Sequence, residues 1–171
     1  MTSIRPAAPA DAPAVRSVHL AAFPTPAEAG LVTRLHEDFD SEISLVAEQV
    51  GEIVGHVMLS RMNVSAGSRA FRALGLGPVG VLPGAQGSGV GSELIRSALG
   101  IAATLGEELV FVLGEPDYYS RFGFSADVAA PFASPYAGHY FMALWLRPNV
   151  APPVDGKADY APAFERLGDS R

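Results

Sequence analysis

The fold is decided by Val79-Gly80-Val81-Leu82-Pro83-Gly84-Ala85-Gln86-Gly87-Ser88-Gly89-Val90-Gly91-Ser92, which runs from an apolar extended segment through a glycine loop into a helix. Without a Cβ, the glycines at positions 87, 89 and 91 allow positive φ and close approach of the backbone to a ligand. The first N–H groups of a helix have no partner inside it, and together with the helix dipole they favour an anion. The segment therefore predicts a phosphate-binding loop between a strand and a helix.

Two other phosphate-binding motifs fit this region less well. A Walker A loop needs Lys and then Ser or Thr after its last glycine, whereas Gly84 to Gly89 is followed by Val90-Gly91. The run from Gly75 to Gly80 matches the dinucleotide pattern G-x-G-x-x-G, but it contains Pro78 and continues as extended chain instead of opening a helix. A flexible glycine turn without a ligand is the plain alternative.

Length and composition favour a single domain. A chain of 171 residues with 49% hydrophobic content can bury about 70% of its unfolded surface. We expect one domain over residues 1–171, with a core at about 2–147 and a Pro-rich extension at 148–171 in which Tyr160 and Phe164 are candidate anchors. The absence of Cys excludes disulfides, thiolate catalysis and Cys-ligated zinc, and the four His lack metal-ligand spacing, so no metal is expected.

Charge and hydropathy limit the partners. The formal net charge is −6 and the twelve basic residues form no cluster in sequence, which argues against a nucleic-acid partner and is compatible with a cationic substrate. The N-terminus has no apolar signal-peptide core, and the uncharged run Ala73–Ser92 contains too much Gly and Pro to span a bilayer. We expect a soluble cytoplasmic protein without a membrane partner, and the sequence leaves a homodimer open.

Apolar patterning predicts alternating strands and helices. The expected strands are Ser3–Arg5, Ser44–Gln49, Ile53–Ser60, Ala73–Val81, Leu109–Leu113 and Tyr140–Leu146. The expected helices start at the N-cap Asp11, at the capping box Thr25-Pro26-Ala27-Glu28, at about Gly89 and at Asp117. We expect loops at Arg61–Phe71 and Asp127–Gly138.

The longest expected helix, about Gly89 to Leu105, has an apolar stripe that predicts its packing against the sheet. The stripe consists of Val90, Leu94, Ala98, Ile101 and Leu105. The following strand, Leu109–Leu113, is apolar throughout, as expected for a strand covered on both faces. A right-handed crossover would place it parallel to the fourth strand.

The order of the expected strands and helices resembles the GNAT superfamily of N-acetyltransferases along nearly the whole chain. Three groups of residues carry the resemblance. Gln86-x-x-Gly89-x-Gly91 resembles the acyl-CoA pyrophosphate loop, and the segment Tyr118 to Phe124 resembles the Y-x-x-x-G-F element. The runs Gly55 to Ser60 and Leu113 to Pro116 resemble the YhbS-like bacterial subgroup. The resemblance implies an α/β (α+β) fold with a mixed, mostly antiparallel sheet of six to seven strands, splayed between strands four and five and flanked by about four helices.

The resemblance also implies an activity and a site. Acetyl-CoA (coenzyme A) would be the cosubstrate, and an amine of a small molecule or peptide would attack it directly. The cofactor-binding residues implied are Val79, Gly80, Val81, Gln86, Gly87, Ser88, Gly89, Val90, Gly91 and Ser92. Tyr119 would be the general acid that protonates the departing thiolate, and Tyr118 is the better candidate for packing.

The general base is not fixed by the sequence. Glu28 is interpreted as a capping residue, Asp117 as an N-cap and His56 as a satisfied buried imidazole, which leaves Glu115. A water-mediated route would need no base at all.

Many relatives have Arg where this chain has Gln86. Two functions from other classes also stay open: a non-catalytic acyl-CoA sensor and a structural interaction protein without ligand.

Overall fold

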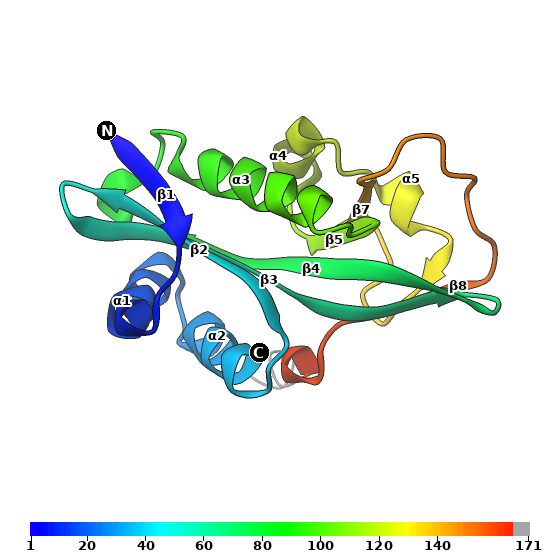
Figure 1. Cartoon of the computed structure of the whole chain (residues 1–171), viewed down its shortest axis with the longest axis horizontal. Helices are drawn as coiled ribbons and strands as arrows, with labels where there is room; N and C mark the ends of the chain where they lie inside the picture. The colour runs from blue at the N-terminus through cyan, green and yellow to red at the C-terminus, as the bar shows by residue number, and fades with distance from the viewer. Residues whose placement is uncertain (166–171) are drawn as a thin grey trace.

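The computed structural model describes residues 1–165 and shows a twisted eight-stranded sheet with helices on both faces (Figure 1). The strands are β1 (Thr2–Pro6), β2 (Ser41–Gln49), β3 (Glu52–Ala66), β4 (Arg69–Val81), β5 (Leu109–Leu113), β6 (Phe132–Ala133), β7 (Phe141–Trp145) and β8 (Gly156–Asp159). They follow the order β1-β2-β3-β4-β5-β7, and β8 pairs with both β3 and β6. The sheet is antiparallel except for the β4–β5 and β6–β8 pairs, so the expected mixed, mostly antiparallel fold class is confirmed.

The helices cover the two faces of this sheet unequally. They are α1 (Ala12–Ala22), α2 (Ala27–Glu37), α3 (Val90–Thr104), α4 (Pro116–Tyr119) and α5 (Ala126–Ala129). Helices α1 and α2 lie on one face, and α3 lies along the other (Figure 1). In the part of the chain that the structure describes, no helix has both the length and the apolar character needed to cross a membrane.

The expected loop at Arg61–Phe71 is wrong, because β3 and β4 continue through it as a long hairpin. The pairing extends to Ala66 opposite Arg69, and the chain turns at Gly67, where φ is +60°. Met62 and Val64 are buried while Asn63 is exposed, so the segment has the alternation of a strand covered on one face. The polar residues of this segment obscure that alternation in the sequence.

The parallel pair β4–β5 diverges beyond its first half. The register runs from Ala73 opposite Leu109 to Leu76 opposite Val112 and ends there, although β4 continues to Val81. The peptide bond Gly77–Pro78 is cis and lies at the divergence. The second half of β4 therefore has one edge paired with β3 and the other edge open, as the splay implied by the resemblance requires.

Helix α3 has the expected length but presents a different stripe to the sheet. Its buried residues are Val90, Leu94, Ile95, Ala98 and Ala102. Ile101 is 37% exposed and Leu105 is 53% exposed, so their predicted burial is wrong. The buried positions 90, 94, 98 and 102 recur every four residues, whereas the helix has 3.6 residues per turn, so the buried face shifts around the helix toward its C-terminal end. Ile101 and Leu105 lie off that face.

Two short elements correct the expected loop at Asp127–Gly138, which contains part of α5 and all of β6. The C-terminal extension is also structured, because β8 pairs with the far end of β3. Phe164 packs in one cluster with Leu31, Leu35 and Met58, and Tyr160 packs against the same cluster, as expected of anchors. Residues 166–171 of the predicted extension lie outside the described residues.

Candidate functional site

The glycine loop between β4 and α3 is exposed and opens toward solvent. Gly87 and Gly89 have φ of +80° and +88°, and a Cβ at either position would have no atom within 4 Å. The side chains of Gln86 and Ser88 fold back onto the loop, donating to the carbonyl of Val81 at 3.0 Å and of Ala85 at 2.8 Å. Contacts to an anion here would therefore come from the backbone N–H groups.

The start of α3 supplies those groups. The helix begins at Val90, and the carbonyl of Gly89 accepts its first bond from the N–H of Glu93 at 3.0 Å. The N–H groups of residues 90, 91 and 92 precede that donor, so they have no acceptor within the helix. A pyrophosphate fits this arrangement of open space, positive φ and helix dipole.

The three strand residues predicted to bind the cofactor alternate between the two faces of β4, so Val79 and Val81 share one face and position 80 faces the other. Val79 lines a cavity at the divergence of β4 and β5. Gly80 faces α1, because a Cβ there would lie 2.8 Å from Nδ1 of His19. Val81 packs in the core below α3. Any contact common to all three would therefore be made by the backbone along the open edge of β4.

A cavity of about 660 Å³ lies at this divergence. Its walls come from β4, from the end of β5, from α2 and from the C-terminal extension. The lining residues are Phe23, Glu28, Leu31, Leu76, Gly77, Pro78, Val79, Leu113, Gly114, Glu115, Tyr119, Tyr136, Tyr140, Tyr160 and Phe164. The cavity therefore lies beside the open edge of β4 and has acidic and aromatic walls.

Tyr119 and Tyr118 are adjacent in sequence but face different parts of the molecule. Tyr119 lines the cavity, and its ring lies so close to Gly114 that a Cβ there would be 2.3 Å from its Cε2. Burial raises the pKa of Tyr119 to about 12, with Tyr118 as a further cause, so the phenol keeps its proton at neutral pH. Tyr118 instead directs its hydroxyl toward Gly91 and lies under the guanidinium of Arg121.

Glu28 is the functional candidate that the sequence interpretation dismissed. The proposed capping box is wrong, since α2 begins at Ala27 with Pro26 as N-cap, and the hydroxyl of Thr25 accepts from the N–H of Ala27 at 3.4 Å. Oε2 of Glu28 is buried in the cavity wall and has no hydrogen-bond partner among residues 1–165. Glu115, the candidate left open, is exposed and also lines the cavity. Glu28 lies far from Tyr119 in sequence, so packing alone brings the two together.

His56 is a satisfied buried imidazole, as expected. Its Nδ1 lies 2.8 Å from Nε2 of His19 and its Nε2 lies 2.8 Å from Oγ of Ser44. Burial lowers the pKa of His56 to about 3, with His19 as the second cause. The residue lies outside the lining of the cavity, so it has no role in proton transfer there.

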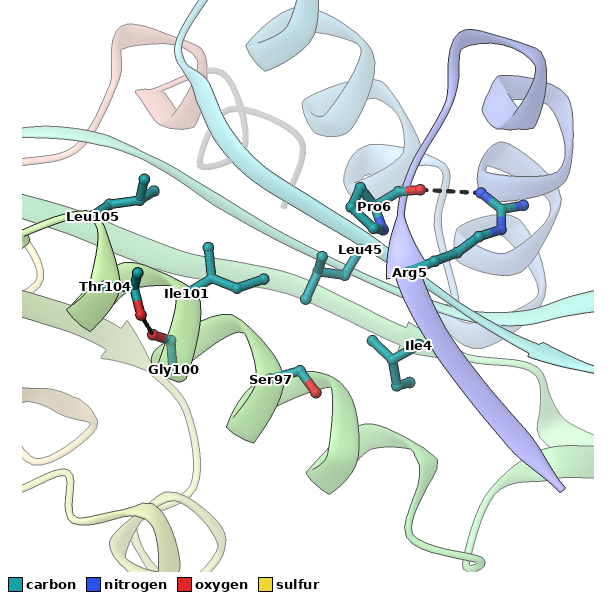
Figure 2. A pocket seen from close by; sticks show the side chains of 9 residues that line it. All are labelled: Ile4, Arg5, Pro6, Leu45, Ser97, Gly100, Ile101, Thr104 and Leu105. Carbon is teal, nitrogen blue, oxygen red and sulfur yellow. Dashed lines mark hydrogen bonds between the residues drawn. The ribbon is translucent and has the colours of Figure 1, made fainter.

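A second hollow lies between β1 and the C-terminal half of α3. Figure 2 shows Ile4, Leu45 and Ile101 pointing into it from three elements, and its volume is about 410 Å³. Its one charged residue, Arg5, already binds Asp11 at 2.7 Å and also pairs with Glu48. The groove thus offers apolar surface without reactive groups. Within residues 1–165, no group of three or more His, Asp or Glu residues is placed to hold a metal ion.

Comparison with known proteins gives consistent matches. Residues 3–126 match the family described as Acetyltransferase (GNAT) domain. The chain is 38% identical over 116 residues to the uncharacterized N-acetyltransferase YjhQ of Escherichia coli K12, an overlap of 67% of this chain and 64% of YjhQ. It is 34% identical over 122 residues to the uncharacterized N-acetyltransferase YhbS of the same strain, covering 71% of this chain and 72% of YhbS. The chain thus spans just under two thirds of YjhQ.

Solved structures show the same fold over almost the whole chain. The crystal structure of YhbS from Escherichia coli in complex with CoA has a TM-score of 0.87 and 29% identity, covering 96% of this chain and 92% of that one. A GNAT family acetyltransferase from Brucella melitensis in complex with acetyl-CoA has a TM-score of 0.77 and 32% identity, covering 96% and 98%. The similarity extends past the family match into the C-terminal extension.

Proposed function

Because this chain belongs to the GNAT acetyltransferase family, we propose that it is an N-acetyltransferase that transfers an acetyl group from acetyl-CoA to the amine of an acceptor. The observation that supports this most is the cavity at the divergence of β4 and β5. It brings Tyr119 together with two carboxylates at the end of the open β4 edge. Acetyl-CoA would supply an activated thioester at that point.

Different parts of this chain bind the cosubstrate and transfer protons. The backbone of the glycine loop and the first turn of α3 hold the pyrophosphate, and the open edge of β4 aligns the rest of the cosubstrate. As the new C–N bond forms and the C–S bond breaks, the nitrogen of the incoming ammonium loses two protons. One passes to water or a carboxylate, and the loss of the other is balanced by the proton gained by sulfur.

Tyr119 would supply the proton that sulfur gains, at the stage when negative charge develops on sulfur. Its pKa of about 12 lies above that of an ordinary thiol, which is about 8.5. Complete transfer from the resting phenol to a free thiolate would be uphill by about 5 kcal/mol, at about 1.4 kcal/mol per pKa unit. We therefore propose that the phenol hydrogen-bonds to the sulfur during C–S cleavage and passes its proton to the sulfur as it regains one from the positively charged attacking nitrogen.

The test is the release of thiol from acetyl-CoA in the presence of a panel of amines. We expect Tyr119→Phe to lower kcat by about 10²- to 10⁴-fold, the usual range for loss of a general acid, with acetyl-CoA affinity nearly unchanged. Turnover by this variant within about threefold of the wild type would remove Tyr119 from the mechanism, since the loss expected of a general acid is far larger.

Tyr118→Phe is the matched control for this variant. It makes the same chemical change one residue away, at a hydroxyl that lies outside the cavity. We expect its kcat to stay close to that of the wild type. A protein that binds acetyl-CoA yet releases no thiol with any amine would instead support the acyl-CoA sensor, and absence of binding would contradict both functions.

A further inference from the structure

The cavity holds two buried polar atoms that the folded chain leaves unpaired. Within residues 1–165 four buried side-chain atoms lack a hydrogen-bond partner, and two of them, Oε2 of Glu28 and the hydroxyl of Tyr160, belong to residues lining this cavity. An unpaired buried polar atom costs about 1–3 kcal/mol, so two in one cavity indicate that a ligand completes their bonding.

Tyr160 faces the same space as the proposed catalytic phenol. Burial raises the pKa of Tyr160 well above its ordinary value, with Tyr136 and Tyr119 as further causes, so its hydroxyl stays protonated. Its ring is fixed against Phe164, with centroids 4.7 Å apart, and against Phe141 at 6.3 Å. The hydroxyl is thus a rigid polar group, able to accept a hydrogen bond from a ligand.

The chemistry of the wall selects a cation. Glu28 and Glu115 are the acidic lining residues, and none of the described residues lining the cavity is Lys, Arg or His. Two carboxylates would repel a carboxylate or phosphate on the ligand, while a buried carboxylate oxygen gains most from a charged donor.

The remaining wall is apolar and aromatic. Its aromatic members are Phe23, Tyr119, Tyr136, Tyr140, Tyr160 and Phe164. Aromatic faces attract ammonium groups and also bury apolar surface. Tyr140 is 54% exposed at this wall, so aromatic surface is available to a ligand that enters from solvent.

We propose that the acceptor is a primary ammonium compound with an apolar body, whose cationic head pairs with Glu28 and whose body lies against the aromatic wall. This inference rests on the proposed function, because it names the second substrate of the same site. Glu28 acts here as a binding group for the acceptor, at a position on α2 that the glycine loop and the Tyr119 segment do not predict.

The experiment measures binding of 2-phenylethylamine to the full chain by calorimetry, without acetyl-CoA. Two probes of similar shape serve as comparisons: 2-phenylethanol lacks the ammonium group, and phenylalanine adds a carboxylate. We expect the amine to bind at least tenfold more tightly than either. Equal affinity for phenylalanine or for the alcohol, or no binding of the amine, would overturn the inference.

Variants then test whether Glu28 is the carboxylate that pairs with the amine. We expect Glu28→Gln to weaken binding of 2-phenylethylamine by about 10- to 100-fold, which is about 1.4–2.8 kcal/mol, and to leave binding of the alcohol unchanged. Glu37→Gln is the matched control, because it removes the same charge from an exposed position on the same helix. Affinity of Glu28→Gln for the amine within threefold of the wild type would contradict the role of Glu28.

Two further readouts separate this inference from the proposed function. The melting temperature of Glu28→Gln should match or exceed that of the wild type, since the variant removes an unpaired buried carboxylate oxygen. Acetyl-CoA affinity and thiol release are measured on the same samples. Absence of acetyl-CoA binding and thiol release in the wild type, with binding of the amine intact, would contradict the transferase alone. Acetyl transfer to amines that is unchanged in Glu28→Gln would contradict the acceptor site alone.

Discussion

At the residue scale, the buried imidazole pair sets how the fold responds to acid. Burial lowers the pKa of His19 to about 4, and burial followed by the proximity of His19 lowers the pKa of His56 to about 3. The two rings meet edge to face with centroids 5.0 Å apart, and both residues are fully buried. An ordinary histidine in the unfolded chain has a pKa of about 6.5. The folded state therefore keeps both rings neutral over a range in which the unfolded chain is protonated.

The expected consequence is a loss of stability in mild acid. Well above pH 6.5 both rings are neutral in the folded and in the unfolded state, so their contribution is fully present there. As the pH falls from 6.5 to 5, the unfolded chain gains protons and the free energy of unfolding should fall. The slope should approach about 1.4 kcal/mol per pH unit for each ring. Urea unfolding at a series of pH values measures this slope.

The variant His19→Gln provides the control for that slope. With one imidazole removed, we expect the slope between pH 6.5 and 5 to fall to about half, whatever the absolute loss of stability. Measurement stays above pH 5 because carboxylates titrate below it. Burial alone would raise the pKa of Glu107, but Arg61 and Arg72 hold it below its ordinary value. An unchanged slope would show that other groups titrate in this range.

Single residues also show where sequence interpretation stops. Tyr119 could be singled out because its motif is local, with Gly123 and Phe124 a few positions away. Glu28 could not, since its neighbours in sequence fit a helix start, while Tyr119 and Tyr160, which line the same cavity, are more than ninety residues away. Only the folded structure identifies one oxygen of its carboxylate, Oε2, as buried and unpaired among the described residues.

At the element scale, the loop before α3 makes a prediction about cofactor affinity. Gly89→Ala adds a methyl group where no protein atom lies within 4 Å and where the pyrophosphate is expected. We expect the dissociation constant for acetyl-CoA to rise at least tenfold, which is about 1.4 kcal/mol. Calorimetric titration of the variant with acetyl-CoA measures it.

Gly106→Ala is a close control for the loop variant. Gly106 has φ of +84° against +88° at Gly89, and its Cβ would also meet nothing within 4 Å. Both variants carry the same strain of about 1–2 kcal/mol for a left-handed alanine, but Gly106 lies at the opposite end of α3. Equal loss of affinity in the two variants would mean that strain, not occupancy of the loop, is responsible.

Elements were predictable where pattern and packing agree. The strand–loop–helix unit was predicted correctly, because Gly87 and Gly89 have the positive φ that glycine adopts readily, although Gly91 lies inside α3 without it. The predicted β3–β4 hairpin was too short, because its polar residues lie on a face with little cover. The buried face at the C-terminal end of α3 was predicted incorrectly, because the groove beside β1 leaves Ile101 uncovered. In both cases the missing information was which neighbour covers which face.

At the scale of the whole molecule, the C-terminal extension contributes both to the sheet and to the cavity. Its strand β8 pairs with β3 from Asn63 to Ala66, on the edge that β2 leaves free. Beyond β8, Phe164 is 8% exposed and packs in a cluster that includes Leu31 and Leu35 of α2 and Met58 of β3. We propose that the extension folds together with the rest of the chain as one domain.

Phe164→Ala tests that proposal through a reporter in another part of the molecule. The only tryptophan, Trp145, lies in β7 against Phe71, in a different apolar cluster. Truncation of a buried Phe costs about 3–5 kcal/mol, and we expect about 3 at this partly covered site. The melting transition seen by Trp145 fluorescence should then move down by about 6–12 °C.

The outcome depends on whether the two clusters unfold together. Val154→Ala is the control, since its side chain is 79% exposed in the same extension and its loss should change stability by less than about 0.5 kcal/mol. If the extension were an independent unit, Phe164→Ala would leave the Trp145 transition at its wild-type temperature. A single lowered transition, the same by fluorescence and by calorimetry, is expected because the cluster around Phe164 includes Met58 of β3, and other residues of β3 belong to the rest of the core.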